Sequence, residues 1–258
     1  MRRRDFSLSV SSLAAAAVLG SPRLAQGFGD EGAFHPRILL TGSSKWEGQR
    51  RSAPGRWSWE LSRRTSAPAK LVPGTVRADA SALLAEPFVV WTGDGPVASL
   101  SGREISGLRR FLLTGGLLFV DDAAPETGAF GREARREVGR VLEDAVVMPL
   151  PASHVVYHSF YLLDRPVGRV EGPKAMEGIV RGGIAQVIFS SHDLLGALAR
   201  DGSGLSSLAV SPGGDQQRER ATRLAVNLAM YVLCSTYKDD QVHAPELMRR
   251  RAGVPSVP

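Results

Sequence analysis

The sequence predicts a three-layer, flavodoxin-like α/β sandwich with a mainly parallel sheet. Short continuous apolar runs, such as 87–91 (PFVVW), 117–120 (LLFV) and 185–190 (AQVIFS), alternate along the chain with amphipathic helical patterns. A strand that is apolar at every position is typical of a parallel sheet that helices cover on both faces.

The first part of the chain contains two predicted strands and two predicted helices. Residues 34–41 (FHPRILLT) form a short apolar run that ends in a Thr-Gly-Ser-Ser turn. Residues 57–65 carry large side chains at helical spacing. A second strand is predicted at 70–76, and a short helix at 79–84.

The central part gives the clearest signals. After the strand at 87–91, Ser101 and Glu104 have the spacing of a capping box, which predicts a helix that Gly115 and Gly116 terminate. The strand at 117–120 follows directly, and residues 130–142 form another amphipathic pattern.

The last third is more varied. Residues 154–163 alternate loosely, which favours an extended edge segment, and 175–180 receive no assignment. After the strand at 185–190, a final helix is predicted at 216–233. One domain at 34–243 and a flexible basic tail at 244–258 account for the chain after its leader.

Residues 1–27 have the features of a twin-arginine signal peptide. The segment Arg3-Arg4-Asp5-Phe6 resembles the twin-arginine consensus, and a mildly apolar stretch of Ala and Ser follows. We expect cleavage just after Ala25 and export to the periplasm or the medium. Because the apolar run at 8–19 is shorter than the roughly 20 residues that span a bilayer, we expect no transmembrane segment in the mature chain.

Charge and cysteine content restrict the possible functions. The formal net charge is +6 over 258 residues, and four arginines against Asp5 give residues 1–25 a net of +3, which leaves +3 for the remainder. The central domain is therefore nearly neutral. It has no basic stripe interleaved with aromatic residues, so the sequence does not predict nucleic-acid binding. The single cysteine, Cys234, cannot form an internal disulfide, and its place in the last helix favours a buried thiol.

The predicted sheet also predicts where a ligand binds. In open parallel sheets, ligands bind beyond the carboxyl ends of the strands, close to the point at which the strand order reverses. The turns that follow the predicted strands carry polar groups suited to a metal or to acid–base chemistry. The candidate ligand-binding rim comprises Thr41, Gly42, Ser43, Thr92, Gly93, Asp121, Asp122, His154, Ser191, His192 and Asp193.

Each of these residues also has an ordinary structural explanation. Asp and Ser after strands form turns and cap helices without any ligand. His154 and His158 lie four residues apart, which suits a metal on a helix but not on an extended segment. A hydrogen-bonded structural role for His154 is the alternative, and no metal site is assigned.

Motifs for known chemistries are absent from the sequence. There is no G-x-S-x-G nucleophile elbow, no P-loop, and no G-x-G-x-x-G after a strand. No cofactor is indicated, and the enzyme question stays open at this point.

Several segments together resemble the bacterial family called domain of unknown function 4159 (DUF4159). They lie at 85–93 (AEPFVVWTG), 109–122 (RRFLLTGGLLFVDD), 150–161 (LPASHVVYHSFY), 182–193 and 223–231 (RLAVNLAMY). The resemblance implies a fold like that of the class I glutamine amidotransferases, in which a cysteine nucleophile follows a central strand. The corresponding turns here carry Asp121-Asp122 or Ser191-His192, so the resemblance favours ligand binding or assembly.

Three functional hypotheses remain. The first is an exported, non-catalytic domain that binds a small molecule or an envelope protein at the rim. The second is a metal-dependent or acid–base hydrolase that uses Asp121, Asp122, His192 and Asp193 on a carbohydrate or envelope substrate. The third is a structural envelope component whose tail from Arg249 contacts anionic surfaces.

Overall fold

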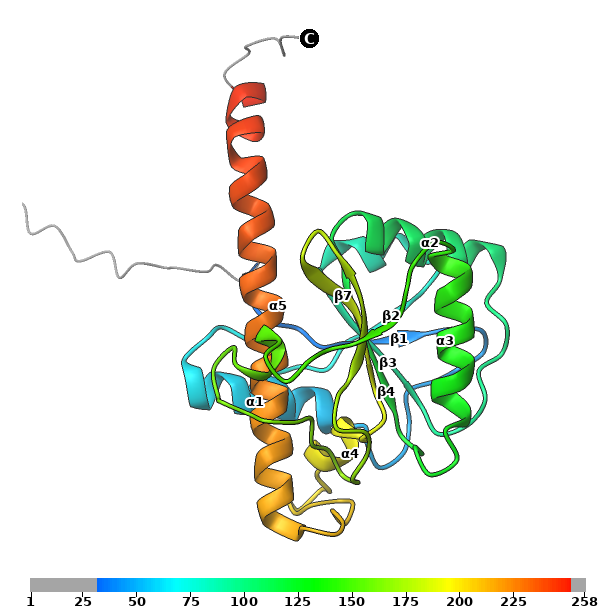
Figure 1. Ribbon diagram of the computed structural model, residues 1–258, viewed down its shortest axis with the longest axis vertical. Helices are drawn as coiled ribbons and strands as arrows, with labels where there is room; N and C mark the ends of the chain where they lie inside the picture. Colours follow the sequence, from blue (N-terminus) through cyan, green and yellow to red (C-terminus); the bar gives the residue numbers. More distant parts are fainter. Residues whose placement is uncertain (1–31, 252–258) are drawn as a thin grey trace, which may run out of the picture.

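The computed structural model describes residues 32–251, with side chains through Ser235, so the predicted signal peptide lies outside the described residues. One sheet runs through the domain (Figure 1). Its strands, in the spatial order β2-β1-β3-β4-β7-β6-β5, are β2 (Thr75–Arg77), β1 (Arg37–Leu40), β3 (Phe88–Gly93), β4 (Leu117–Asp122), β7 (Ile184–Ser190), β6 (Glu177–Arg181) and β5 (Met148–Pro149).

The sheet is mostly parallel. Strands β2, β1, β3, β4 and β7 run in one direction, β6 is antiparallel to β7, and β5 is antiparallel to β6. The first five strands therefore have the flavodoxin-type order, in which the chain reverses its direction of progress between β1 and β3.

Helices cover both faces, which makes three layers. In Figure 1, α1, α4 and α5 lie on one side of the sheet, and α2 and α3 lie on the other. Their bounds are α1 (Ala53–Thr65), α2 (Gly102–Leu113), α3 (Ala129–Val141), α4 (Leu194–Leu198) and α5 (Gly214–Arg251). The α/β three-layer prediction is confirmed.

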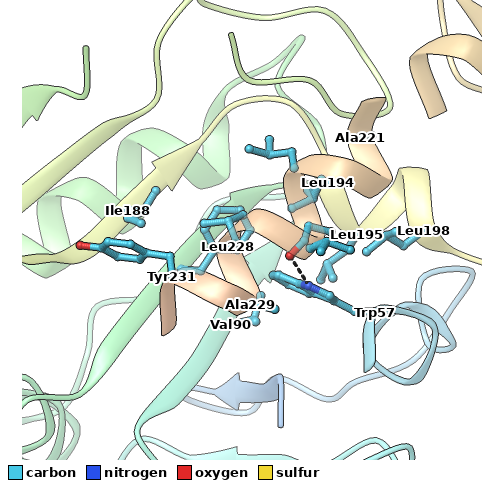
Figure 2. Packing of buried hydrophobic residues seen from close by; sticks show 14 of the residues in the cluster. Trp57, Val90, Ile188, Leu194, Leu195, Leu198, Ala221, Leu228, Ala229 and Tyr231 are labelled. Atoms are coloured by element: carbon cyan, nitrogen blue, oxygen red, sulfur yellow. Dashed lines mark hydrogen bonds between the residues drawn. The ribbon is translucent and has the colours of Figure 1, made fainter. Parts of the chain in front are cut away.

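Two apolar cores result from the alternation of strand side chains. In β3, Val90 packs into the core beneath α1, α4 and α5, whereas its neighbour Val89 packs into the core beneath α2 and α3. Figure 2 shows the first core, where the buried indole of Trp57 donates a 2.6 Å hydrogen bond to the Ala225 carbonyl of α5. This bond satisfies the only polar atom of a side chain that is otherwise ideal for burial.

The helix starts follow local sequence. At α2, the Ser101 hydroxyl accepts a hydrogen bond from the Glu104 amide, and the Glu104 carboxylate accepts one from the Ser101 amide. The predicted capping box is therefore confirmed.

Some expectations were wrong. Residues 154–163 are not an extended edge: Val155–Tyr157 form the 3-10 helix η3, because His154 Nδ1 accepts a hydrogen bond from the Val156 amide and Tyr157 is fully buried. The segment at 79–84 is likewise a 3-10 helix, η2 (Ser81–Ala85).

The last helix is longer than predicted, and its cysteine faces outward. Helix α5 continues to Arg251 and so includes the beginning of the segment predicted as a tail. Cys234 is exposed, because Tyr231 and Val232 occupy the inner face of α5 at this level. The buried-thiol prediction is therefore wrong.

Candidate functional site

The carboxyl ends of the central strands meet at one edge of the sheet. In the parallel register, Thr92 lies beside Asp121, Gly93 beside Asp122, and Asp121 beside Ser190. The structure therefore brings together the predicted turns after β3, β4 and β7. We call this edge the rim.

Asp193 is at the centre of the rim. It follows β7 with a left-handed backbone (φ 53°), and its carboxylate is fully buried. Arg50 donates two hydrogen bonds to it, from Nε at 2.8 Å and from Nη2 at 2.6 Å, and Arg169 donates another from Nε. The same carboxylate caps α4 by accepting the Gly196 amide at 2.9 Å. Two guanidinium groups and a helix amide thus compensate the burial of this charge.

Asp121 lies beneath the start of α4. Its two carboxylate oxygens accept the amides of Leu194 and Leu195, at 3.0 and 2.9 Å, and it is fully buried. Burial, followed by the negative charge of Asp193, raises the pKa of Asp121 to about 7, although the two amides act in the opposite direction.

Asp122 joins β4 to α3. Its carboxylate accepts the amides of Ala124 and Gly131, both at 3.1 Å. A Cβ at position 131 would lie 2.7 Å from Asp122 Oδ2, so only glycine allows α3 to begin this close to the carboxylate. Asp122 therefore fixes the start of α3.

The turn after β1 is attached to the start of α2. Gly42 has a positive φ of 54°, and its amide donates a 2.6 Å hydrogen bond to Glu104. Thr41 is buried, and Ser43 is exposed to solvent. Because α1 and α2 leave the sheet on opposite faces after β1 and β3, this turn borders the switch point at which a crevice is expected.

The turn after β3 is closed by an aromatic ring. A Cβ at Gly93 would lie 2.6 Å from the Phe130 ring, so glycine is required for α3 to pack here. The Thr92 hydroxyl is buried and has no hydrogen-bond partner among the described residues.

Sequence reasoning missed the two arginines that hold Asp193. Arg50 comes from the loop after β1 and also donates a 2.9 Å hydrogen bond to the Ala123 carbonyl. Arg169 comes from the segment between β5 and β6. No local pattern marks either residue, because their partner lies 143 and 24 residues away.

The segment around Arg169 lies directly on the turn after β7. The Arg169 and Val170 amides donate to the carbonyls of Asp193 and His192, at 3.1 and 3.2 Å. A Cβ at Gly168 would lie 2.1 Å from the His192 carbonyl oxygen, so the two backbones are in close contact. We call residues 165–172 the strap.

His192 lies under the strap. It is 1% exposed, and its Nε2 is 3.0 Å from the Pro173 carbonyl, whereas its Nδ1 has no partner among the described residues. Burial lowers the pKa of His192, and the nearby Arg165 adds to this effect. His192 lines a cavity of about 140 Å³ between the strap and the start of α5. Ser191 lines a separate cavity of about 470 Å³ beside Arg135 and Glu177.

His154 does not join the rim. Its ring packs on Tyr231, with 5.8 Å between the ring centroids, and the Tyr231 hydroxyl accepts the amide of Ala185 near the beginning of β7. The rim residues follow the end of that strand, so His154 lies toward the opposite edge of the sheet. Burial lowers the pKa of His154.

Two further features are absent from the described part of the chain. Among the side chains described, those of residues 32–235, no set of three or more His, Cys, Asp or Glu residues has an arrangement that would hold a metal ion. No helix within residues 32–251 is both long and apolar enough to cross a membrane.

The fold and the rim define a class: three-layer α/β domains with a flavodoxin-type parallel sheet and a polar edge at its carboxyl end. The particular family follows from sequence comparison. The model of the family described as a domain of unknown function (DUF4159) matches residues 37–233, and the chain belongs to this family. No curated protein matches the chain.

Proposed function

We propose that this chain is an exported, non-catalytic α/β domain of the cell envelope that binds a small molecule or a protein partner at the rim. One observation carries the proposal. The carboxylates of Asp121, Asp122 and Asp193 all accept hydrogen bonds from backbone amides or arginines of the chain itself. They hold the rim in one shape instead of presenting reactive oxygens to a substrate.

The burial of these groups supports binding over catalysis. A general base must lie within about 3 Å of the proton that it removes. Asp121 is fully buried beneath α4, and Asp193 is fully buried between two arginines. A substrate at the surface therefore does not reach the carboxylate oxygens of either residue. The neighbouring turns, with Ser43 and Asp94 at the surface, supply polar contacts for a ligand.

Export and the finer fold relationship are part of the same proposal. The Arg3-Arg4 segment and the absence of any cysteine pair in the sequence suit a chain that folds in the reducing cytoplasm and then leaves it for the periplasm or the medium. The flavodoxin-type strand order supports a relationship to the glutamine amidotransferase-like fold. An amidotransferase reaction is not proposed, because the rim turns carry aspartate and histidine in place of cysteine.

Thermal-shift screening of the purified chain against nucleotides, sugars and divalent metals tests the binding proposal. A ligand at about 100 times its dissociation constant adds roughly 2.7 kcal/mol of stability. We expect at least one ligand to raise the melting temperature of the unmodified chain. This shift should disappear in a Ser43→Trp, Asp94→Trp double variant, because two tryptophans at these exposed positions block the rim. Leu113→Trp, at the exposed end of α2, is the matched control and should keep the shift. A shift that survives in the blocked variant would place the site elsewhere.

The acid–base hydrolase is the second candidate, and it requires the start of α4 to move before a substrate reaches the buried carboxylate of Asp121. The pKa of Asp121, raised to about 7, lies in the range that suits a general acid or base at neutral pH. A screen of carbohydrate and envelope substrates, followed by Asp121→Asn, tests this candidate. Turnover that the substitution abolishes without unfolding the protein would support the hydrolase, and turnover that survives would remove Asp121 from the mechanism.

A further inference from the structure

The two outermost strands of the sheet, β2 and β5, differ in their exposed residues. Strand β2 exposes Thr75 and Arg77, and Arg77 pairs with the nearby Asp79. Charged side chains on an outermost strand oppose pairing with another chain. Strand β5 instead belongs to the segment 146–149 (VVMP), in which every residue is exposed and none is charged. We call residues 146–149 the β5 border.

The backbone of the β5 border is available for pairing. Strand β5 is antiparallel to β6, and no described strand lies on its other side. The Leu150 amide donates to the Met176 carbonyl at 2.8 Å, on the side of β6. Because amides alternate in direction along an antiparallel strand, the amide and carbonyl of Val147 point away from β6. Pro149 has no amide hydrogen, so Val147 is the residue of the border that both donates and accepts on the open side.

Apolar side chains surround the β5 border. Val146 is 70% exposed and Met148 is 44% exposed. Both line a cavity of about 520 Å³, whose walls also include the exposed side chains of Leu113 in α2 and Val180 in β6. Contiguous exposed apolar patches on a globular domain are typical of protein contacts.

Unpaired charges of opposite sign flank the two ends of the β5 border. Asp144 is exposed three residues before Val147, in the wall of the 520 Å³ cavity. At the other end, Arg132 of α3 and Pro149 line the cavity of about 470 Å³. The Arg132 guanidinium donates to the Thr127 carbonyl, and neither Arg132 nor Asp144 has an ion-pair partner within residues 32–235.

The other charged residues that line these two cavities are paired or lie further inside the sheet. Arg181 belongs to β6, one strand away from the border. The remaining four form two ion pairs, Arg109–Glu143 and Arg135–Glu177. Asp144 and Arg132 are therefore the unpaired charges at the two ends of the border.

The β5 border is complementary to itself under twofold symmetry. In an antiparallel contact centred on Val147, the two copies of this residue exchange amide-to-carbonyl hydrogen bonds. Val146 of one copy then lies opposite Met148 of the second copy, because the two residues are equally far from the centre. Each copy thus covers the apolar side chains of the other.

The same symmetry brings opposite charges together. Asp144 of one copy lies opposite Leu150 of the second copy, three residues on either side of Val147. Leu150 follows Pro149, which lines the same cavity as Arg132. Each copy therefore directs its unpaired carboxylate toward an unpaired guanidinium of the other. This charge complementarity favours a second copy of the chain over an unrelated partner.

We propose that two copies of this chain associate through the β5 border, in a twofold contact that continues the sheet from β5 of one copy to β5 of the other. Asp144 of each copy pairs with Arg132 of the other. The contact uses the same surface on both copies, so it closes at two. It leaves Ser43 and Asp94 free and is independent of the ligand proposed for the rim.

Sedimentation velocity of the purified chain over a range of concentrations tests the proposal. We expect a concentration-dependent species with twice the mass of a single chain. Asp144→Arg and Arg132→Glu should each weaken the association about tenfold or more, because each brings like charges together twice in the pair. The double variant exchanges the two signs and should restore the association.

Exposed charges far from β5 provide matched controls. Glu47→Arg, in the loop after β1, and Arg103→Glu, in α2, make the same changes of charge and should not alter the association. Val146→Asp places a charge in the apolar centre of the contact and should weaken it at least tenfold. All these positions are exposed, and circular dichroism of each variant checks that it is folded.

Three results would overturn the proposal. The first is a chain that keeps the mass of a single copy at several hundred micromolar. The second is a pair that Asp144→Arg and Arg132→Glu both leave intact, because another surface then makes the contact. The third is a double variant that folds but does not restore the association, because Asp144 and Arg132 then do not face each other across the twofold axis.

Discussion

The two edges of the sheet hold charged residues in different environments. At the carboxyl edge, Asp121 and Asp193 are fully buried, and the partners of Asp193 are two arginines from distant loops. At the amino edge, Glu86 is 20% exposed and pairs with Lys70 at 2.7 Å, close to His35 and Arg37. Burial makes each interaction at the first edge costly to break, whereas water replaces much of what is lost at the second.

The cavities at the two edges differ as well. The amino edge has a cavity of about 590 Å³, whose walls include the Thr114-Gly115-Gly116 turn and the β6–β7 hairpin. The cavity under the strap is about 140 Å³. The larger cavity has few charged groups, and the smaller one has several together with a buried histidine. The two cavities therefore differ in chemistry as well as in volume.

The largest expected effect comes from Asp193. Asp193→Ala leaves Arg50 and Arg169 without their shared carboxylate and removes the cap of α4, so we expect a loss of about 3–5 kcal/mol in the free energy of unfolding. Denaturant unfolding measures this loss. Glu143→Ala breaks the exposed pair with Arg109 and should cost less than about 1 kcal/mol. Similar losses in the two variants would show that burial does not distinguish the pairs.

A smaller effect should appear in the pH dependence of Asp121. Its pKa is raised from the usual 3.8 to about 7, so the folded chain holds a proton on Asp121 that the unfolded chain releases above pH 4. The stability that this proton provides is complete below about pH 4 and is lost as the pH rises to about 7, by at most about 1.4 kcal/mol per pH unit. Relative to Asp121→Asn, the unmodified chain should therefore become less stable over this range. A constant difference between the two would contradict the raised pKa.

The smallest effect, with the opposite sign, is expected at Glu86. Burial acts to raise the pKa of Glu86, but the hydrogen bond from Lys70 and the charges of His35 and Arg37 lower it overall from the usual 4.5. Its contribution is present above pH 4.5 and is lost as the pH falls through the lowered pKa. Because the group is partly exposed, Glu86→Gln should cost about 1 kcal/mol or less at neutral pH. Unfolding measured from pH 3 to 7 should show slopes of opposite sign for Glu86→Gln and Asp121→Asn, each relative to the unmodified chain.

The sequence by itself determined the fold class and the position of the rim. The apolar strand residues at 88–91, 117–120 and 187–190 are buried on both faces, and that requirement is visible in the residues themselves. The capping box at Ser101 and Glu104 depends on four consecutive residues, so it is local as well. Parallel strands end at one edge, which is why the turns after them come together.

Only the tertiary structure decided what the rim residues do. Whether Asp193 is a free carboxylate or a buried ion pair depends on Arg50, which lies 143 residues away, and no spacing rule connects them. His154 lies toward the other edge of the sheet because its ring packs on Tyr231 of α5, and the orientation of Cys234 depends on which face of α5 meets the core. Local sequence patterns predict which residues of a segment are buried and which face solvent. The charge and reactivity of a side chain depend instead on groups distant in the sequence, which folding brings within a few ångströms of it.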